Sequence, residues 1–246
     1  MLQARGIRLE AAAPAIDLAV KRGEIVGLAG LEGHGQEAFI ETLCGLNRPI
    51  AGAVTVRKPN GDEARVTSFE GAVRLGLAYL PRDRRGTGIF PGQSVLDNFA
   101  IAALPRHATL GIVRRRPLRE RLRAFRDRLS MVYDRPEAPI GTLSGGNQQK
   151  VLLARWLACE PRIMLLNDPT RGVDLGTRMK LYETFRDLAH GDGMPLVVLS
   201  TEIEEILRLC DRVLVFRERA VSRELGSGEL TMDRVIAAMF GQSEAA

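Results

Sequence analysis

The sequence has 246 residues, which is long enough for one globular domain with a buried core and an inserted subdomain. Its hydrophobic content of 45% and charged content of 26% are ordinary for a globular chain, and no run of about 18 apolar residues predicts a membrane span. A net charge of +5 is too mild to require nucleic acid, and the start of the chain lacks a basic-then-apolar leader, so secretion is not expected.

The first predicted elements in chain order are a buried strand, a glycine-rich loop and a helix. A continuous apolar run at residues 25–29 predicts the strand, and the loop follows at residues 30–35. The helix is predicted over residues 36–43, with Gly45 as its stop signal. A strand, a glycine-rich loop and a helix in this order are typical of phosphate-binding sites.

A small peripheral sheet is predicted next. Its short strands are expected over residues 52–57 and 64–67, joined by a Pro-Asn-Gly turn at residues 59–61. Residues 67–70, Thr-Ser-Phe-Glu, fit a capping box, so a helix is expected from there to about Leu75.

Residues 91–150 differ in character from the rest and predict an inserted helical subdomain. Four apolar residues recur at helical spacing on one face of a predicted helix: Leu118, Leu122, Phe125 and Leu129. Arginines occupy the other faces, at positions 114, 115, 116, 119, 121, 123, 126 and 128. They are typical of a solvated helix face, and contact with a partner protein or with anionic lipid is the alternative.

The remaining segments alternate between strands and helices. We predict strands over residues 77–80, 163–166, 196–199 and 213–216, and helices over residues 144–157, 175–189 and 202–209. Such alternation predicts an α/β fold with a parallel sheet that helices cover on both faces. Residues 243–246 are expected to be frayed.

The predicted loop has the spacing of a phosphate-binding loop but not its side chains. A working loop carries Gly, four residues, Gly, Lys and then Ser or Thr. The lysine neutralises phosphate groups and the hydroxyl ligates Mg²⁺, while the glycines let backbone N–H groups approach. Gly30, Gly33 and Gly35 are in place here. Gln36 stands where lysine is expected, and Glu37 stands where the hydroxyl is expected.

These two replacements weaken the expected affinity for a phosphate. Losing the lysine removes a charge-assisted interaction of about 1.5–3 kcal/mol, which corresponds to roughly 10- to 100-fold in affinity. Glu37 adds a negative charge near the phosphates, although a carboxylate is also able to ligate Mg²⁺. Taken alone, the same glycine pattern also fits an ordinary turn between a strand and a helix.

A motif farther along the chain gives the loop its context. Residues 143–150, Leu-Ser-Gly-Gly-Asn-Gln-Gln-Lys, resemble the signature motif of ATP-binding cassette (ABC) ATPases, and their ending resembles the sugar-importer branch. Residues 162–170 are similar to the Walker B segment, and residues 171–174 to the D-loop that follows it. Residues 79–84 resemble the Q-loop region in the form found in the second cassette of sugar importers. The resemblance covers nearly the whole chain.

The resemblance implies that the ligands are ATP and Mg²⁺ and that two cassettes pack head to tail. The signature motif of one cassette then contacts the γ-phosphate of ATP held by the loop of the other. The signature residues implied are Ser144, Gly145, Gly146, Asn147 and Gln148. A helix that starts at such a motif offers free N–H groups and a favourable dipole to an anion.

Several residues depart from the family pattern in the site for the domain's own nucleotide. Asn167 replaces the aspartate that supports Mg²⁺, and Asp168 replaces the glutamate that polarises the attacking water. Thr201 replaces the switch histidine, and Arg82 stands at the Q-loop position. No aromatic residue precedes Phe39, so the usual adenine-stacking residue is missing. We therefore expect Mg–ATP binding there to be weak or absent, without hydrolysis, and we assign no metal ligand.

The implied fold is a P-loop NTPase core with a parallel sheet, a peripheral antiparallel β part and an inserted helical signature subdomain. The whole chain is then one cassette. Its α/β core is expected over residues 1–90 and 151–225, its helical subdomain over residues 91–150, and a C-terminal helix and tail over residues 226–246.

The implied function is that of an ATP-binding subunit of an importer for simple sugars or nucleosides, which couples ATP binding and hydrolysis to transport. Its own site is expected to be degenerate, while its signature motif completes the site of the partner. Expected partners are a second cassette, transmembrane permease subunits docking near residues 82–130 and, indirectly, a periplasmic sugar-binding protein, with no nucleic acid. The expected location is cytoplasmic, at the inner face of the membrane.

Two other functions stay open. In one, Gln36 and Glu37 bind Mg–ATP in an altered way and the chain is an active soluble ABC ATPase. In the other, the chain is a non-catalytic regulatory module that never meets ATP. Hydrolysis by the isolated chain would favour the first, and the intact signature motif argues against the second.

Overall fold

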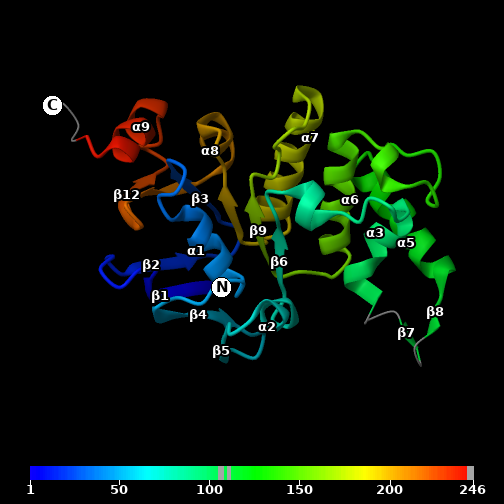
Figure 1. Ribbon diagram of the computed structural model, residues 1–246, viewed down its shortest axis with the longest axis horizontal. Helices are drawn as coiled ribbons and strands as arrows, with labels where there is room; N and C mark the ends of the chain where they lie inside the picture. The colour runs from blue at the N-terminus through cyan, green and yellow to red at the C-terminus, as the bar shows by residue number, and fades with distance from the viewer. Residues whose placement is uncertain (105–107, 110–111, 243–246) are drawn as a thin grey trace. The chain divides into compact units, whose positions relative to one another are not determined.

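The computed structural model describes residues 1–104, 108–109 and 112–242, and the chain divides into two compact units (Figure 1). The first unit comprises Met1–Tyr79, Arg162–Pro169 and Phe185–Ala246, and the second comprises Leu80–Pro161 and Thr170–Thr184. The sequence-based boundaries at residues 90, 150 and 225 stay a prediction. The expected fraying of residues 243–246 lies outside the described residues.

A six-stranded sheet forms the centre of the first unit, in the order β12-β11-β3-β10-β9-β6. The strands are β3 (Ile25–Gly30), β6 (Leu77–Leu80), β9 (Ile163–Asn167), β10 (Leu196–Leu199), β11 (Arg212–Arg217) and β12 (Ala220–Gly226). The predicted parallel pairing is confirmed for β11 with β3, β3 with β10, and β10 with β9. The edge strand β12 instead runs antiparallel to β11, because a tight turn with positive φ at Glu218 and Arg219 reverses the chain directly.

Helices cover both faces of this sheet, as predicted. The helices of the first unit are α1 (Gln36–Leu43), α2 (Phe69–Arg74), α8 (Ile203–Leu209) and α9 (Met232–Phe240). Phe39 of α1 shares one hydrophobic cluster with Val26 and Leu28 of β3. Gly27 lies between those two residues and so faces the other side, where a Cβ would lie 2.8 Å from Cys210 Sγ at the end of α8. Figure 1 shows α8 and α9 on that side and α1 on the other.

A four-stranded antiparallel sheet, in the order β2-β1-β4-β5, completes the first unit. Its strands are β1 (Leu2–Arg8), β2 (Ile16–Val20), β4 (Ala51–Arg57) and β5 (Glu63–Arg65). The peripheral sheet predicted from residues 52–57 and 64–67 is therefore present, with a shorter second strand. The cap of α2 is Ser68, not Thr67, since Ser68 Oγ accepts from the N–H of Gly71 at 3.1 Å.

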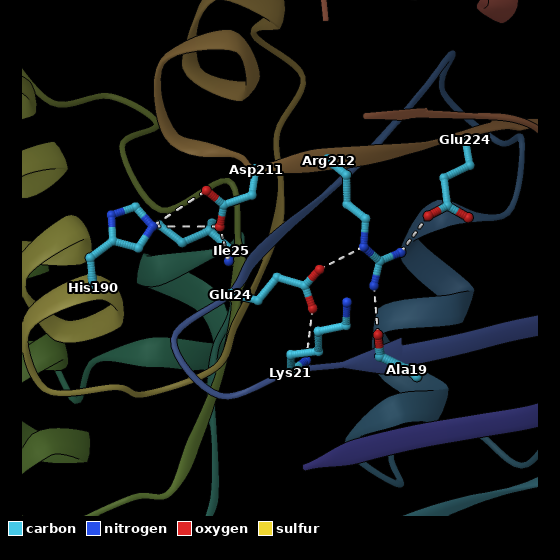
Figure 2. A network of polar contacts seen from close by, with 8 residues as sticks. All are labelled: Ala19, Lys21, Glu24, Ile25, His190, Asp211, Arg212 and Glu224. Atoms are coloured by element: carbon cyan, nitrogen blue, oxygen red, sulfur yellow. Dashed lines mark hydrogen bonds and ion pairs between the residues drawn. The ribbon is translucent and has the colours of Figure 1, made fainter. Parts of the chain in front are cut away.

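A polar network joins the two sheets of the first unit near the beginnings of β3 and β11 (Figure 2). Arg212 Nε donates to Glu24 Oε1 at 2.7 Å, and Nη1 donates to Glu224 Oε1 at 2.8 Å. The same guanidinium donates through Nη2 to the carbonyl oxygen of Ala19 on β2. The side chains of Arg212 and Glu24 are only 18% and 13% exposed, so their ion pair is largely shielded from solvent.

The second unit is mainly helical. Its helices are α3 (Val95–Ala100), α5 (Arg115–Arg128), α6 (Gly145–Leu157) and most of α7 (Leu175–Arg186), with the short strands β7 (Ala108–Thr109) and β8 (Ile112–Val113). The predicted apolar face of α5 is confirmed, since Leu118, Leu122 and Leu129 are buried and the Phe125 ring lies 5.7 Å from that of Phe99.

The arginines of α5 extend mostly toward exposed carboxylates. The ion pairs are Arg115–Asp97, Arg116–Glu120, Arg119–Glu137 and Arg121–Glu160. The two pairs measured at 2.8 Å join α5 to other segments of the second unit. This pairing favours the interpretation of these arginines as a solvated helix face. Within the part of the chain that the structure describes, no helix has the length and apolar character needed to cross a membrane.

Candidate functional site

The first group of predicted site residues lies in the first unit, in the loop between β3 and α1. Gly33 and Gly35 have φ angles of 83° and 106°, in the left-handed region that favours glycine. Gly35 also precedes α1 as its N-cap, where a Cβ would lie 2.9 Å from the Cα of Arg219. The glycine spacing therefore has a backbone reason of its own, and the side chains decide what the loop does.

Gln36 folds back over this loop. Its Nε2 donates to the carbonyl oxygens of Leu31 at 2.8 Å and Gly30 at 3.1 Å. The residue is 6% exposed, and its Oε1 makes no hydrogen bond to the described part of the protein. A neutral amide thus ties the end of the loop to its beginning, at the position where a phosphate-binding loop carries a cation.

Glu37, in the first turn of α1, is half-buried beside Asn167 at the end of β9. The Nδ2 group of Asn167 donates to Glu37 Oε1 at 3.4 Å and to the hydroxyl oxygen of Tyr79 at 3.1 Å. Burial raises the pKa of Tyr79 above its ordinary value, so this hydroxyl stays protonated at neutral pH. The amide of Asn167 therefore turns its donor side toward the carboxylate of Glu37.

The structure also brings together Asp168 and Thr201, which were predicted as the substituted catalytic positions. Asp168 Oδ1 accepts from the backbone N–H of Thr201 at 2.7 Å and from its hydroxyl at 3.1 Å. The backbone N–H of Asp168 donates to the carbonyl oxygen of Leu199, and its φ angle is 46°. Asp168 is 4% exposed, and its carboxylate faces Thr201, just after the end of β10.

The side chains named in this group are acidic or neutral. Glu37 and Asp168 carry the negative charge, while Gln36, Asn167 and Thr201 contribute amides and a hydroxyl. Such a set offers acceptors to a cation more readily than it offers donors to a phosphate. Among the described residues, no cluster of three or more His, Cys, Asp and Glu side chains is arranged to hold a metal ion.

The second group of predicted site residues lies in the second unit, at the beginning of α6. Ser144 is the N-cap, as predicted, and its Oγ accepts from the backbone N–H of Asn147 at 3.4 Å and from Nδ2 at 3.0 Å. Asn147 Oδ1 in turn accepts from the N–H of Val132 at 2.7 Å. Gln148 is 4% exposed and donates to the carbonyl oxygen of Leu143 at 3.1 Å. These polar side chains hold the helix start from within the unit.

The two glycines of the motif let neighbouring segments approach the helix start closely. A Cβ at Gly145 would lie 2.8 Å from the carbonyl oxygen of Gly172, and a Cβ at Gly146 would lie 2.8 Å from Thr177 Cγ2. Both distances are too short for a real side chain. The signature segment therefore depends on glycine for its packing, and it lies at a helix N-terminus, a position that suits an anion.

Two arginines that were not predicted as site residues contact α6 or belong to it. Arg84 donates to side chains of the helix, and Arg155 extends from the helix to other segments. Arg155 Nε and Nη1 donate to the carbonyl oxygens of Asn98 and Gly88 at 2.6 Å, and Nη2 donates to Asn98 Oδ1 at 3.0 Å. Burial lowers the pKa of Arg155 to about 10. Asn98 also pairs through its amide with the backbone of Phe90, on both N–H and carbonyl.

The sequence carries a local signal for one part of this network. Ser94 is the N-cap of α3, since its Oγ accepts from the Asp97 N–H at 3.0 Å and donates to Asp97 Oδ2 at 2.5 Å. This cap begins α3, the helix that contains the fully buried Asn98. The partners of Arg84 and Arg155, in contrast, lie 57 to 87 positions away along the chain, and no local pattern indicates them.

The second unit also has a pocket of about 410 Å³ beside α3 and α5. It is lined by Phe90, Gln93, Leu96, Asp97, Ala100, Ile101, Leu104, Arg115 and Leu118. Phe90 and Ile101 are exposed apolar residues at this pocket, and Asp97 and Arg115 form an ion pair at its edge. The pocket therefore offers a mostly apolar surface with a polar rim, as protein-binding sites do.

Comparison with known proteins gives consistent findings. Residues 14–171 match the protein family described as ABC transporter. The ribose import ATP-binding protein RbsA 2 of Rubrobacter xylanophilus is 39% identical over 245 residues, which is 98% of this chain and 46% of that protein. A putative ribose/galactose/methyl galactoside import ATP-binding protein of Pseudomonas fluorescens is 38% identical over 236 residues, 96% of this chain and 45% of that protein. The chain thus spans about half the length of these relatives.

Solved structures match the fold along most of the chain. A bacterial ABC transporter cassette solved as a dimer aligns with a TM-score of 0.77 at 20% identity, over 92% of this chain and 99% of that one. A cassette solved in its ADP conformation aligns with a TM-score of 0.77 at 19% identity, over 98% of this chain and 99% of that one. The predicted α/β cassette fold, with its antiparallel β part, is confirmed by these alignments.

Proposed function

The chain belongs to the ABC transporter family, and from that premise we propose that it is the second, degenerate ATP-binding cassette of an importer for simple sugars or nucleosides. The relatives named for ribose and galactose import support the substrate class, and their roughly doubled length supports a pairing with another cassette. In this role the signature motif of the chain completes the ATP site of its partner, while its own loop does not turn ATP over.

One contrast carries the proposal. The helix start at Ser144 keeps the capping hydroxyl and the two tightly packed glycines, at a helix N-terminus that suits an anion. The loop between β3 and α1 has instead a neutral amide, Gln36, bonded to its own carbonyl groups. The half that serves a partner is intact, and the half that serves the chain itself is altered.

The side chains present do not fit Mg–ATP well at the chain's own loop. Gln36 brings no charge to offset the β- and γ-phosphates, and Glu37 adds a carboxylate of the same sign. The donor group of Asn167 is bonded to that carboxylate, and a neutral amide is a weaker Mg²⁺ ligand than the aspartate of the family pattern. Asp168 is held by Thr201 through two hydrogen bonds. No catalytic step is therefore assigned to this loop.

The expected partners follow from the same role. The apolar pocket lined by Phe90, Leu96 and Ile101 lies within residues 82–130, the segment proposed to receive the transmembrane permease. The partner cassette supplies the nucleotide that the signature motif contacts. A periplasmic sugar-binding protein acts indirectly, through the permease, and the assembly is proposed to place this chain at the cytoplasmic face of the membrane.

The test is the affinity of the full chain for Mg–ATP, measured by titration calorimetry. The parent is compared with Q36K/E37T, which restores the cation and the hydroxyl, and with the neutral control Q36M/E37T. We expect no measurable binding by the parent and the control, and binding at least about 10-fold tighter in Q36K/E37T, because a charge-assisted interaction is restored.

Micromolar binding with hydrolysis by the parent would contradict the proposal and favour the active soluble ATPase. Equal binding by Q36K/E37T and Q36M/E37T would show that the missing cation does not limit affinity. If no variant bound Mg–ATP, the substitutions at Gln36 and Glu37 would not explain the lack of binding, and the regulatory module would be favoured.

A further inference from the structure

Arg84 lies in the second unit, at the beginning of a short π-helical turn (Arg84–Gly88) that follows β6. Its guanidinium reaches two segments that are distant in sequence. Nε donates to Gln148 Oε1, and Nη1 donates to Gln149 Oε1 and to the carbonyl oxygen of Arg171, each at 3.3 Å. One side chain therefore joins the segment after β6, the first turns of α6 and the loop before α7.

The backbone that presents this arginine is itself well held. Asp83 caps the turn, with its Oδ1 accepting from the N–H of Gly86 at 2.9 Å. The carbonyl oxygen of Asp83 accepts from the Thr87 hydroxyl at 2.8 Å and from the Thr87 N–H at 3.0 Å. Arg84 thus projects from a fixed turn, which reduces the entropy cost of its own contacts.

The guanidinium also lies close to Gly145, the first glycine of the signature motif. A Cβ built at Gly145 would lie 3.0 Å from Arg84 Nη2 and 2.8 Å from the carbonyl oxygen of Gly172. The first residue of α6 is therefore enclosed between the arginine and the 171–172 backbone. The position of Gly145 and of the N–H groups beside it therefore depends on the positions of Arg84 and of the 171–172 backbone.

Stability alone does not account for an arginine at this place. Its three acceptors are neutral oxygens, and its charge lies beside a helix N-terminus, which repels cations. Burial lowers the pKa of Arg84, and the neighbouring charge of Arg85 lowers it further. The planar guanidinium is nevertheless well suited to the place, because it is able to bridge three oxygens in fixed directions, whereas the point charge of lysine is not.

We propose that Arg84 is a positioning residue for the signature motif, which holds the start of α6 and the 171–172 backbone in the arrangement that receives the partner's nucleotide. This inference rests on the proposed function. Arg84 acts through Gln148 and Gln149 and not through contact with ATP. Its loss should therefore lower the rate of the closed, hydrolysing state more than the affinity of the open state for ATP.

The experiment is steady-state Mg–ATP hydrolysis by the assembled transporter, purified with its partner cassette and permease. The variants are R84M, R84K, S144R and the control R74M, which changes a 70% exposed arginine of the first unit outside residues 82–130. We expect R84M to lower kcat about 10- to 100-fold with KM for ATP within about 2-fold, since small displacements of positioned groups cost this much. R84K should fail to restore kcat, because the bridging geometry is absent, and R74M should match the parent.

The arms separate failure of this inference from failure of the proposed function. Normal hydrolysis by S144R would overturn the trans-site role and this inference with it. Abolished hydrolysis in S144R together with normal kcat in R84M would overturn the positioning role alone. A raised KM at unchanged kcat in R84M would also overturn it, because Arg84 would then act on ATP binding. Full recovery in R84K would overturn it too, because only the charge of Arg84 would then matter.

A folding defect is distinguished by a milder variant. If R84M does not assemble, Q149L is assayed in its place, since it removes one of the three acceptors and leaves the arginine. We expect a decrease in kcat of about 3-fold with KM unchanged, because two of the three hydrogen bonds of the guanidinium remain. Unchanged kcat in an assembled Q149L transporter would contradict the proposal.

Discussion

At the scale of single residues, the side chains at the loop between β3 and α1 bond to other groups of the first unit. Gln36 bonds to the loop carbonyls, Asn167 bonds to Glu37, and Asp168 bonds to Thr201. Each of these side chains thus has a hydrogen-bond partner inside the first unit. Side chains that stabilise the resting loop are less available to a nucleotide, because binding would have to break these hydrogen bonds first.

Asp168 gives a prediction that separates backbone strain from hydrogen bonding. Its φ of 46° suits glycine and asparagine but not alanine, and its carboxylate accepts two hydrogen bonds from Thr201. We expect D168A to lower the free energy of unfolding by about 2–3 kcal/mol, since alanine is strained at this φ and offers no acceptor. D168G should cost less, and D168N should lie within about 1 kcal/mol of the parent because it keeps an acceptor.

The measurement is urea unfolding followed by Trp156 fluorescence and by circular dichroism. The order of the three variants is the result that matters, more than any single value. Equal destabilisation by D168N and D168A would mean that neither the acceptor nor the backbone conformation contributes as described.

At the scale of elements, the signature helix α6 is anchored near both ends by arginines. Arg84 bonds to Gln148 and Gln149 near its beginning, and Arg155 bonds to Asn98 and Gly88 near its end. Both arginines join α6 to the segment of residues 84–90. Since Phe90 in that segment also lines the apolar pocket, the pocket wall and the signature helix form one continuous packed assembly.

Asn98 is the central member of this assembly, and its removal should be costly. The residue is fully buried, its Oδ1 accepts from Phe90 N–H at 2.8 Å and from Arg155, and its Nδ2 donates to Phe90 and Ser94 carbonyl oxygens. We expect N98A to lower the free energy of unfolding by about 3–5 kcal/mol, because a buried cation and several backbone groups lose partners.

The matched control is S94A, which removes only the N-cap of α3 and should cost about 1 kcal/mol. Both variants are compared with the parent by chemical denaturation, and amide hydrogen exchange at residues 88–91 reports the local effect. A cost for N98A no larger than that for S94A would contradict the central role of Asn98.

The elements that the sequence predicted best are those with a local signal. Ser144 marked the start of α6, and the apolar runs marked β3, β9, β10 and β11. β1 and β12 were not predicted, because their apolar residues are sparse. β2 was not predicted either, although its residues Ile16, Leu18 and Val20 alternate as those of a half-buried strand should. The partners of Arg84 could not be predicted, because they meet only through the tertiary fold.

At the scale of the whole molecule, long-range ion pairing in the first unit joins segments that the sequence keeps far apart. Arg212 contacts Glu24 of the loop before β3, Glu224 on β12 and the carbonyl oxygen of Ala19 on β2 (Figure 2). The antiparallel sheet and the six-stranded sheet are therefore linked through one guanidinium. The family resemblance predicted both sheets but gave no reason to single out this arginine, which belongs to no motif.

This link makes stability depend on pH in a stated direction. Burial opposes the charge on Glu24, but the hydrogen bonds from Arg212 and the Lys21 backbone, with the charges of both residues, bring its pKa below the ordinary value. A carboxyl group with a lowered pKa in the folded state stabilises the protein above its unfolded pKa and loses that contribution as pH falls through the folded pKa. The contribution of the pair should thus be complete at pH 7.5 and reduced at pH 4.

We expect R212M to lower the free energy of unfolding by about 2–4 kcal/mol at pH 7.5, because Glu24 becomes a shielded charge without its partner. The difference from the parent should shrink at pH 4, where Glu24 in the variant is protonated. E224Q is the control: Glu224 is 55% exposed, so its loss should cost less than about 1 kcal/mol at either pH. Urea unfolding at both pH values measures these differences. An equal loss of unfolding free energy for R212M at pH 7.5 and pH 4 would show that the guanidinium acts through packing and its bond to Ala19, not through Glu24.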